Sequence, residues 1–277
     1  MTTPSLSLTT NIKRHPFLIG PDPGLLYLTA SLKATLQKVR LVFELKQGLT
    51  TMLGDVGMGK TTVLRYLHGH YVNNEAYLTA YLPSPNFPSD FAFLKSICGE
   101  FGLSPKRSMV AQEQELRRFL TELYKQDKTA VLFIDEAHCL NGKHLELIRV
   151  LLNFETDKTK LLQILLVAQL ELRDKLRDKS KHAIRSRIFA PSLLAPLTLN
   201  ETREMIAYRC EQVQLPNPFP SETVEAIYLK TGGIPREILK ICLMAWELMK
   251  RLGETTVPPE AIKEIAPEAT YEDDSNE

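Results

Sequence analysis

The segment from Gly54 to Thr61 has the residue types and spacing of a phosphate-binding loop. It reads Gly-Asp-Val-Gly-Met-Gly-Lys-Thr, which fits the Walker A pattern Gly-x4-Gly-Lys-Ser/Thr. Its glycines permit positive φ, so backbone N–H groups can turn toward a phosphate at the start of a helix. We expect Lys60 to reach the β- and γ-phosphates of ATP. The predicted nucleotide-binding residues are Gly54, Asp55, Val56, Gly57, Met58, Gly59, Lys60, Thr61 and Thr62.

Two acids, Asp135 and Glu136, follow the apolar run 131–134, as in a Walker B strand. We expect Asp135 and the Thr61 hydroxyl to hold Mg²⁺, which prefers oxygen ligands. Glu136 would act as a base or orienting group for the attacking water. The alternatives are a glycine-rich turn with an incidental lysine and a surface acid at a strand end. With Ala137 and His138 the acids also spell the helicase DEAH box, but we expect no second RecA-like domain in this length.

The surrounding pattern predicts strands that alternate with helices. Apolar, β-branched runs favour strands at 49–53, 75–81, 131–134 and 161–168. Helices are expected at 29–46, from Thr61, from Ser89 or Asp90 through Ile97, and at 112–125 and 143–155. This alternation predicts an α/β fold with a doubly wound parallel sheet, whose ligands bind at the carboxyl ends of the strands.

After residue 198 the pattern predicts helices only. Asn200 and Ser221 are expected to cap two of them, Pro235 suits the first turn of a third, and Pro258 opens a last short one. We therefore predict a lead-in at 1–28, a nucleotide-binding domain at 29–197, a small helical lid at 198–267 and a disordered acidic tail at 268–277.

Composition excludes several classes of protein. The chain has 277 residues, 44% hydrophobic residues and a net charge of +1, which is typical of a globular protein without a global charge bias. Four separated cysteines form no Cys-x-x-Cys pair and are expected to be buried thiols. No apolar run reaches the length of a membrane span, and no signal peptide opens the chain. We expect a cytoplasmic protein without a membrane contact.

Further stretches resemble one family. Pro21-Asp22-Pro23 with Tyr27-Leu28, the stretch 153–164 beginning Asn-Phe-Glu-Thr-Asp, and Gly232-Gly233-Ile234-Pro235-Arg236 are similar to parts of the ExeA/GspA-type AAA+ ATPases. The resemblance covers roughly residues 15–250. The transposon target-selection ATPases of the TnsC, TniB and MuB group look like relatives with the same two-part plan, an AAA+ P-loop NTPase domain followed by a helical lid.

The resemblance implies roles for four more residues. Gln169, after the last predicted strand, looks like sensor 1, which would bond the γ-phosphate or the water. Arg236 in the lid looks like sensor 2. Arg187, in preference to Arg185, looks like an arginine finger that completes a neighbour's site, so the family plan implies a homo-oligomer, either a ring or a helical filament.

The biological task has three candidate answers. The first is a factor that assembles with ATP on duplex DNA and regulates a transposase, and Lys106 and Arg107 are the candidate DNA contacts. The second is an ExeA-like secretion-assembly ATPase that acts on protein partners. ExeA-type proteins carry further parts after the ATPase, and the end of this chain after the lid favours the first candidate. The third is a nucleotide-gated switch whose hydrolysis is incidental.

Overall fold

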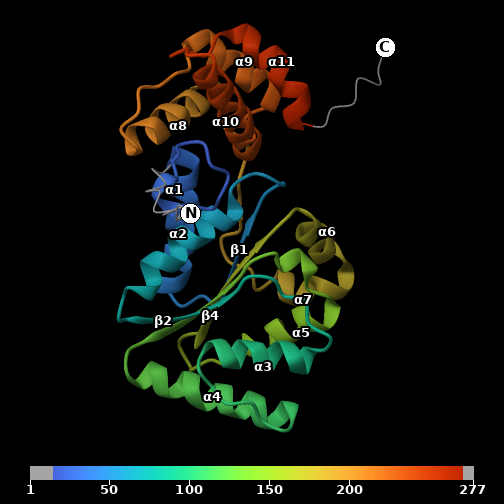
Figure 1. Ribbon diagram of the computed structural model, residues 1–277. Coiled ribbons are helices and arrows are strands. Elements are labelled where there is room, and N and C mark those ends of the chain that lie inside the picture. Colours follow the sequence, from blue (N-terminus) through green and yellow to red (C-terminus); the bar gives the residue numbers. More distant parts are fainter. Residues whose placement is uncertain (1–14, 271–277) are drawn as a thin grey trace, which may run out of the picture. The chain divides into compact units, whose positions relative to one another are not determined.

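The computed structural model describes residues 15–270, which divide into two compact units. One comprises residues 21–196, and the other comprises residues 15–20 with residues 197–270. The larger unit contains a five-stranded, all-parallel sheet in the order β2-β3-β4-β1-β5. Its strands are β1 (Leu49–Leu53), β2 (Tyr77–Leu82), β3 (Thr129–Ile134), β4 (Leu162–Ala168) and β5 (Ser192–Leu193) (Figure 1). The predicted α/β fold with a parallel sheet is confirmed.

The two faces of this sheet are both covered because alternate strand residues point to opposite sides. In β3, Val131 and Phe133 pack with buried residues of α1 and α2, whereas Leu132 and Ile134 pack with helices of the other side. These helices are α1 (Ala30–Glu44), α2 (Lys60–Val72), α3 (Asp90–Glu100), α4 (Met109–Lys125), α5 (Gly142–Leu151), α6 (Glu171–Arg177) and α7 (His182–Arg185). Burial on both sides explains why β1, β3 and β4 are buried throughout.

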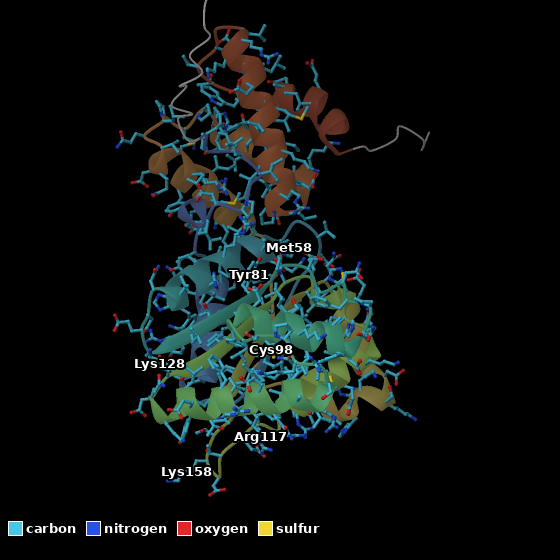
Figure 2. All side chains as sticks on the ribbon, turned by 60° about the horizontal axis from the view of Figure 1, so that its bottom comes forward. Met58, Tyr81, Cys98, Arg117, Lys128 and Lys158 are labelled. Atoms are coloured by element: carbon cyan, nitrogen blue, oxygen red, sulfur yellow. The ribbon has the colours of Figure 1, made fainter. Side chains whose placement is uncertain are left out.

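The ends of the parallel strands form two opposite edges of the sheet. Met58 and Tyr81 mark the edge where strands end, and Lys128 and Lys158 mark the edge where strands begin (Figure 2). Short 3-10 turns complete the unit: η1 (Pro23–Leu25), η2 (Ala137–Cys139) and η3 (Lys179–Lys181). Because the strands are parallel, every segment that follows a strand starts at the first of these edges.

The smaller unit is helical, with α8 (Leu199–Gln212), α9 (Ser221–Thr231), α10 (Pro235–Arg251) and α11 (Pro259–Thr270). Residues 15–20 pack with it: Phe17 is fully buried, and its ring meets that of Phe219 at 5.3 Å between centroids. Arg209 Nη1 donates to the Pro16 carbonyl oxygen at 2.7 Å. The division therefore assigns part of the predicted lead-in to the predicted lid.

Several predicted boundaries are wrong. The capping residue of α8 is Thr198 and not Asn200, because Thr198 and Glu201 bond reciprocally. Pro220 precedes α9, so Ser221 is its first residue. Helix α5 ends at Leu151, four residues early, because 153–160 turns back in a hairpin that bridges Glu155 and Lys160. Helix α11 runs to Thr270, past the predicted start of the tail, whose last seven residues lie outside the described range.

The cysteines and the apolar segments can also be compared with the expectations from composition. Cys98, Cys210 and Cys242 are buried thiols as predicted, but Cys139 is exposed. Within residues 15–270, no helix combines the length and the apolar character that crossing a membrane requires. The described residues also hold no group of three or more metal-binding side chains of the His, Cys, Asp or Glu type.

Candidate nucleotide site

The loop from Gly54 to Gly59 connects β1 to α2 at the carboxyl edge of the sheet. Gly57 and Gly59 have φ of 82° and 79°, which side-chain-bearing residues rarely adopt. Gly54 lies against Leu194, whose Cβ is 3.2 Å from the position that a Cβ on Gly54 would take. Helix α2 has no side-chain cap at its amino end. Its first N–H groups and its positive dipole end are therefore arranged as in an anion-binding site.

Lys60 lies at the first position of α2 and is 7% exposed. Its Nζ donates to the carbonyl oxygens of Gly54 at 2.9 Å and Asp55 at 2.8 Å, so the side chain folds over the loop. The positively charged ammonium group therefore lies inside the loop, where it can donate hydrogen bonds to phosphate oxygens.

The two predicted metal ligands are in direct contact. The Thr61 hydroxyl donates to Asp135 Oδ2 at 2.8 Å, although the residues are 74 positions apart in the chain. Asp135 is 2% exposed, and its Oδ1 accepts from the Glu136 N–H at 2.9 Å. Burial raises the pKa of the Asp135 carboxyl, and the bond from Thr61 opposes that rise. A hydroxyl oxygen and a carboxylate oxygen in contact are ligands of the type that Mg²⁺ prefers, so this pair fits that ion.

Glu136 and Gln169 follow neighbouring strands and lie close to one another through a third residue. Glu136 has φ of 50° and a side chain that is 36% exposed. His138 Nε2 lies 3.4 Å from Glu136 Oε2 and 3.3 Å from Gln169 Nε2. The structure thus brings the predicted base and the predicted sensor together, which sequence spacing alone did not show.

Tyr81 at the end of β2 is a further residue beside the acids that the sequence reasoning missed. Burial raises the pKa of its phenol, and the negative charge of Asp135 adds to the effect. Its position at a strand end was the available signal. For His138 the signal was the DEAH spelling, which we had interpreted only as a helicase resemblance.

Comparison with known proteins identifies the unit that carries this site. Residues 44–176 match the family model described as an AAA domain. This stretch, which is just under half of the chain, is similar to an AAA domain. The general secretion pathway protein A of Aeromonas hydrophila is 31% identical over 234 residues, which are 83% of this chain and 42% of that protein. An uncharacterised HTH-type transcriptional regulator of Methanocaldococcus jannaschii is 27% identical over 158 residues, or 55% of this chain and 38% of that protein. The chain therefore spans about two fifths of the length of these curated relatives.

Solved structures show the same fold at lower identity. The Aeropyrum pernix ORC2 protein in its ADPNP–ADP complexes superposes with a TM-score of 0.63 at 18% identity, covering 86% of this chain and 66% of that one. The A. pernix ORC1 protein in complex with DNA gives 0.61 at 16% identity, covering 92% and 69%. The RuvB branch migration motor of Thermotoga maritima gives 0.57 at 17% identity, covering 91% and 74%. These likenesses support the AAA+ P-loop fold.

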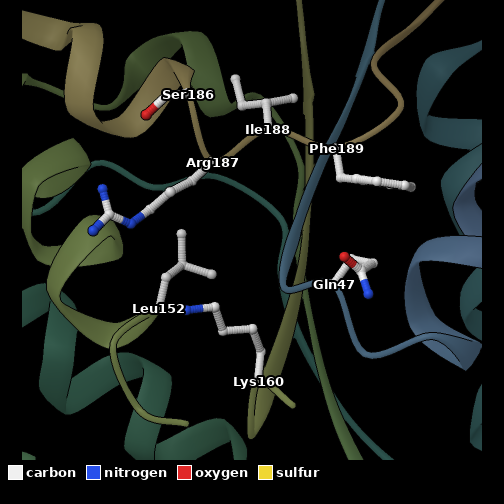
Figure 3. Close-up of a pocket in the computed structure, with 7 residues that line it drawn as sticks. All are labelled: Gln47, Leu152, Lys160, Ser186, Arg187, Ile188 and Phe189. Atoms are coloured by element: carbon white, nitrogen blue, oxygen red, sulfur yellow. The ribbon is translucent and has the colours of Figure 1, made fainter. Parts of the chain in front are cut away.

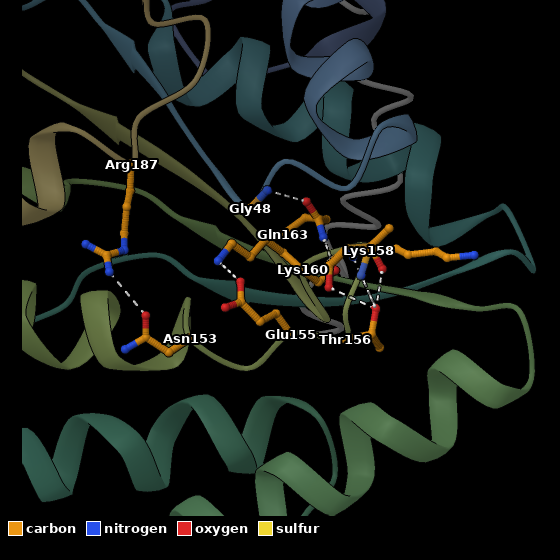
Figure 4. A network of polar contacts seen from close by, with 9 residues as sticks. Gly48, Asn153, Glu155, Thr156, Lys158, Lys160, Gln163 and Arg187 are labelled. Atoms are coloured by element: carbon orange, nitrogen blue, oxygen red, sulfur yellow. Dashed lines mark hydrogen bonds and ion pairs between the residues drawn. The ribbon is translucent and has the colours of Figure 1, made fainter.

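The predicted arginine finger, Arg187, lies at the other edge of the sheet from the loop 54–59. Arg187 Nη1 donates to the Ala183 carbonyl oxygen at 2.7 Å, and its Nη2 donates to Asn153 Oδ1 at 3.2 Å (Figure 4). With Lys160 it lines a pocket of about 220 Å³ beside the start of β1 (Figure 3). The other lining residues are Gln47, Leu152, Ser186, Ile188 and Phe189.

Arg185 is engaged differently from Arg187. Its Nη1 donates to the carbonyl oxygens of Leu176 at 3.4 Å and Arg177 at 3.2 Å, where it joins the end of α6 to α7. These bonds give Arg185 a local structural role. Arg187 instead contacts Ala183 and Asn153 at the surface, and the choice between the two arginines stays a prediction.

The remaining candidates occupy separate places. Arg236 is exposed in the first turn of α10, within the smaller unit. Lys106 and Arg107 precede α4; Lys106 forms an ion pair with Glu115 at 3.6 Å, and Arg107 is exposed. The roles predicted for these three residues stay predictions.

Proposed function

We propose that this chain is an ATP hydrolase whose chemistry occurs between the Walker A loop and the acids after β3. The observation that carries the proposal is the 2.8 Å bond between the Thr61 hydroxyl and Asp135, beneath a loop whose glycines have positive φ. Few structural roles require a buried carboxylate, a buried lysine and an uncapped helix start at one point. A triphosphate with its metal uses all three.

Each residue then has a task. Lys60 exchanges its bonds with loop carbonyls for bonds with phosphate oxygens. Thr61 and Asp135 hold Mg²⁺, which when bound neutralises charge on the phosphates. The carboxylate of Glu136 orients the attacking water and accepts its proton, while the amide of Gln169 bonds the water or the γ-phosphate. Arg236 is proposed to act as sensor 2.

The position of Arg187 supports a working oligomer. Ile188 pairs beside Leu49 at the start of β1, and the loop begins after Leu53 at its end. Arg187 therefore lies beside Gly48, and the six residues from Gly48 to Gly54 span about 20 Å at the rise of a strand. This distance is longer than an arginine side chain. We therefore propose that Arg187 serves the site of a neighbouring copy, in a head-to-tail ring or filament.

Substitutions at the site test the hydrolase proposal. Glu136→Gln is expected to retain ATP binding, nearly abolish turnover and lock the ATP-bound oligomer, because the amide cannot accept the proton of the water. Lys60→Ala is expected to lose nucleotide affinity. Binding of a fluorescent ATP analogue and release of phosphate are the two measurements. Unchanged turnover in Glu136→Gln, or unchanged binding in Lys60→Ala, would refute the assigned roles.

For the cellular task, the best-supported candidate is assembly of a secretion apparatus on protein partners. The supporting observation is the 31% identity to a general secretion pathway protein across 83% of this chain. Copurification of the tagged protein with an envelope complex, dependent on ATP and on an intact Lys60, is the expected result. Copurification that is the same for Lys60→Ala would contradict an ATP-driven role.

The second candidate is the predicted regulator of DNA transposition, which assembles on duplex DNA and acts on a transposase. It is supported by the exposed Arg107 beside Lys106, and one structural neighbour, ORC1, was solved in complex with DNA. An ATP-dependent shift of duplex DNA is expected if this role holds. Removing both cations should lower the salt dependence of binding by a log–log slope of about 1.8, or 0.9 per lost phosphate contact. Both candidate tasks use ATP and imply a cytoplasmic ATPase domain.

A further inference from the structure

His138 lies between the predicted base and the predicted sensor, and neither role assigned so far uses it. Its Nε2 atom is 3.4 Å from Glu136 Oε2 and 3.3 Å from the Gln169 amide. The imidazole belongs to η2, directly after β3, whereas Gln169 follows β4. One ring nitrogen therefore joins side chains that come from two strands of the sheet.

The protonation of this ring follows from its contacts. A carboxylate only accepts hydrogen bonds, so we assign the ring hydrogen to Nε2, which faces Glu136. The oxygen and nitrogen of a glutamine amide are assigned from such networks, and a protonated Nε2 requires Gln169 to present its oxygen. The other ring nitrogen, Nδ1, is buried and has no hydrogen-bond partner among residues 15–270. All polar contacts of the ring that the structure shows therefore pass through Nε2.

The backbone that carries the ring is held from the same side as the sensor. Lys175, in α6, donates through Nζ to the carbonyl oxygen of His138 and, at 3.4 Å, to that of Leu140. Helix α6 begins two residues after Gln169. The turn that carries His138 and the segment that carries Gln169 are thus tied together, which limits how far the ring can move relative to either partner.

We propose that His138 is a positioning residue that holds the Glu136 carboxylate and the Gln169 amide in one arrangement around the attacking water. Glu136 needs such a restraint because its side chain is 36% exposed and has rotamer freedom at the surface. A base that leaves its reacting geometry by about 1 Å loses about 100-fold in rate. This inference rests on the proposed hydrolase function and assigns His138 no contact with nucleotide.

The test compares three substitutions of His138. His138→Ala is expected to lower kcat by about 10- to 100-fold while the KM for ATP changes less than about two-fold, because the ring orients the base and does not bind substrate. The glutamine amide nitrogen reaches the place of Nε2, so His138→Gln should recover kcat to within about three-fold of the parent. The shorter asparagine reaches only the place of Nδ1, and His138→Asn should stay as slow as His138→Ala.

The control is His70→Gln, which alters an exposed histidine at the far end of α2 and should leave kcat unchanged. Thermal unfolding of each variant reports folding separately, and if His138→Ala does not fold, the comparison of the Gln and Asn variants decides. Equal kcat for those two variants, whether fast or slow, would overturn the inference. A parent protein that does not hydrolyse ATP refutes the proposed function itself. A parent that turns over normally beside an unaffected His138→Ala refutes only the role of His138.

Discussion

Arg187→Ala is expected to bind ATP normally and to lose turnover, because its guanidinium completes a site in another copy. An arginine finger contributes about 10³-fold or more to the rate of phosphoryl transfer. The structure separates this residue from its own loop by about 20 Å of strand, from the level of Gly48 to Gly54, at about 3.3 Å per residue. Loss of turnover in the variant alone does not show that the finger acts between subunits, so a mixing experiment is needed.

The mixing partner is Glu136→Gln, which keeps Arg187 but cannot turn over ATP itself. In a random one-to-one mixture, half of the subunits are Arg187→Ala, and half of these have a Glu136→Gln neighbour on the side that supplies the finger. About a quarter of all sites then combine an intact Glu136 with an intact finger, so the mixture should reach about a quarter of the parent rate per subunit, as a head-to-tail assembly requires. Each variant alone should be nearly inactive.

Phosphate release is measured at fixed total protein over a series of mixing ratios. Activity should follow the product of the two fractions, with its maximum at equal amounts. Arg185→Ala is the matched comparison, because it removes a neighbouring guanidinium that bonds Leu176 and Arg177. It should lower thermal stability, and mixing should not restore any lost activity. A linear response to mixing, or a fully active Arg187→Ala protein, would refute the argument.

Three further predictions concern stability, measured by urea unfolding. Asp135→Asn should raise the free energy of unfolding of the nucleotide-free protein by about 0.5–2 kcal/mol. Burial raises the pKa of this carboxyl, so its negative charge at neutral pH destabilises the folded state. A variant less stable than the parent would contradict this reasoning. Gly233→Ala should lower the free energy of unfolding by at least about 2 kcal/mol, because φ is +78° and a Cβ would lie 2.0 Å from the Leu197 carbonyl oxygen. Gly253→Ala, where φ is +80° and no atom lies within 4 Å of the Cβ position, should lower it by only about 1 kcal/mol. Burial lowers the pKa of His144, so the unfolded state binds a proton more readily than the folded state as the pH falls below about 6.5. The free energy of unfolding then decreases by at most about 1.4 kcal/mol per pH unit. His144→Gln should show a smaller decrease between pH 7.5 and 5.5.

The nucleotide loop was predictable because its residues are consecutive. The residue types of Gly54 through Thr61 determine the loop conformation locally. The apolar runs on either side favour a strand and a helix independently of the rest of the chain. The helix boundaries were less predictable, because several residues compete for each cap. Thr198 wins over Asn200 since its reciprocal partner Glu201 stands three residues later, and that pairing was the signal that we missed.

Contacts between distant residues were beyond the sequence. Nothing near Phe17 indicates that its ring packs on Phe219, 202 positions along the chain, or that Arg209 bonds the Pro16 carbonyl. The two-residue strand β5 has too few residues for any periodicity, and it exists because Met52 and Leu53 offer their free edge to Ser192 and Leu193. Such pairings depend on the tertiary fold, which supplies the partner that local pattern cannot show.

Strand direction explains why one part of the site was predictable and another was not. In a parallel sheet, the residues that directly follow each strand lie at one edge, so the predicted strands bring Gly54, Asp135 and Gln169 to the same edge. Arg187 could not be placed in this way, because β5 was not predicted. This argument gives edges but no pairs. It brings His138 to the correct edge, three residues after Asp135, without indicating that Nε2 lies between two particular side chains. The pair contacts depend on rotamers and on the positive φ of Glu136, and only coordinates supply those.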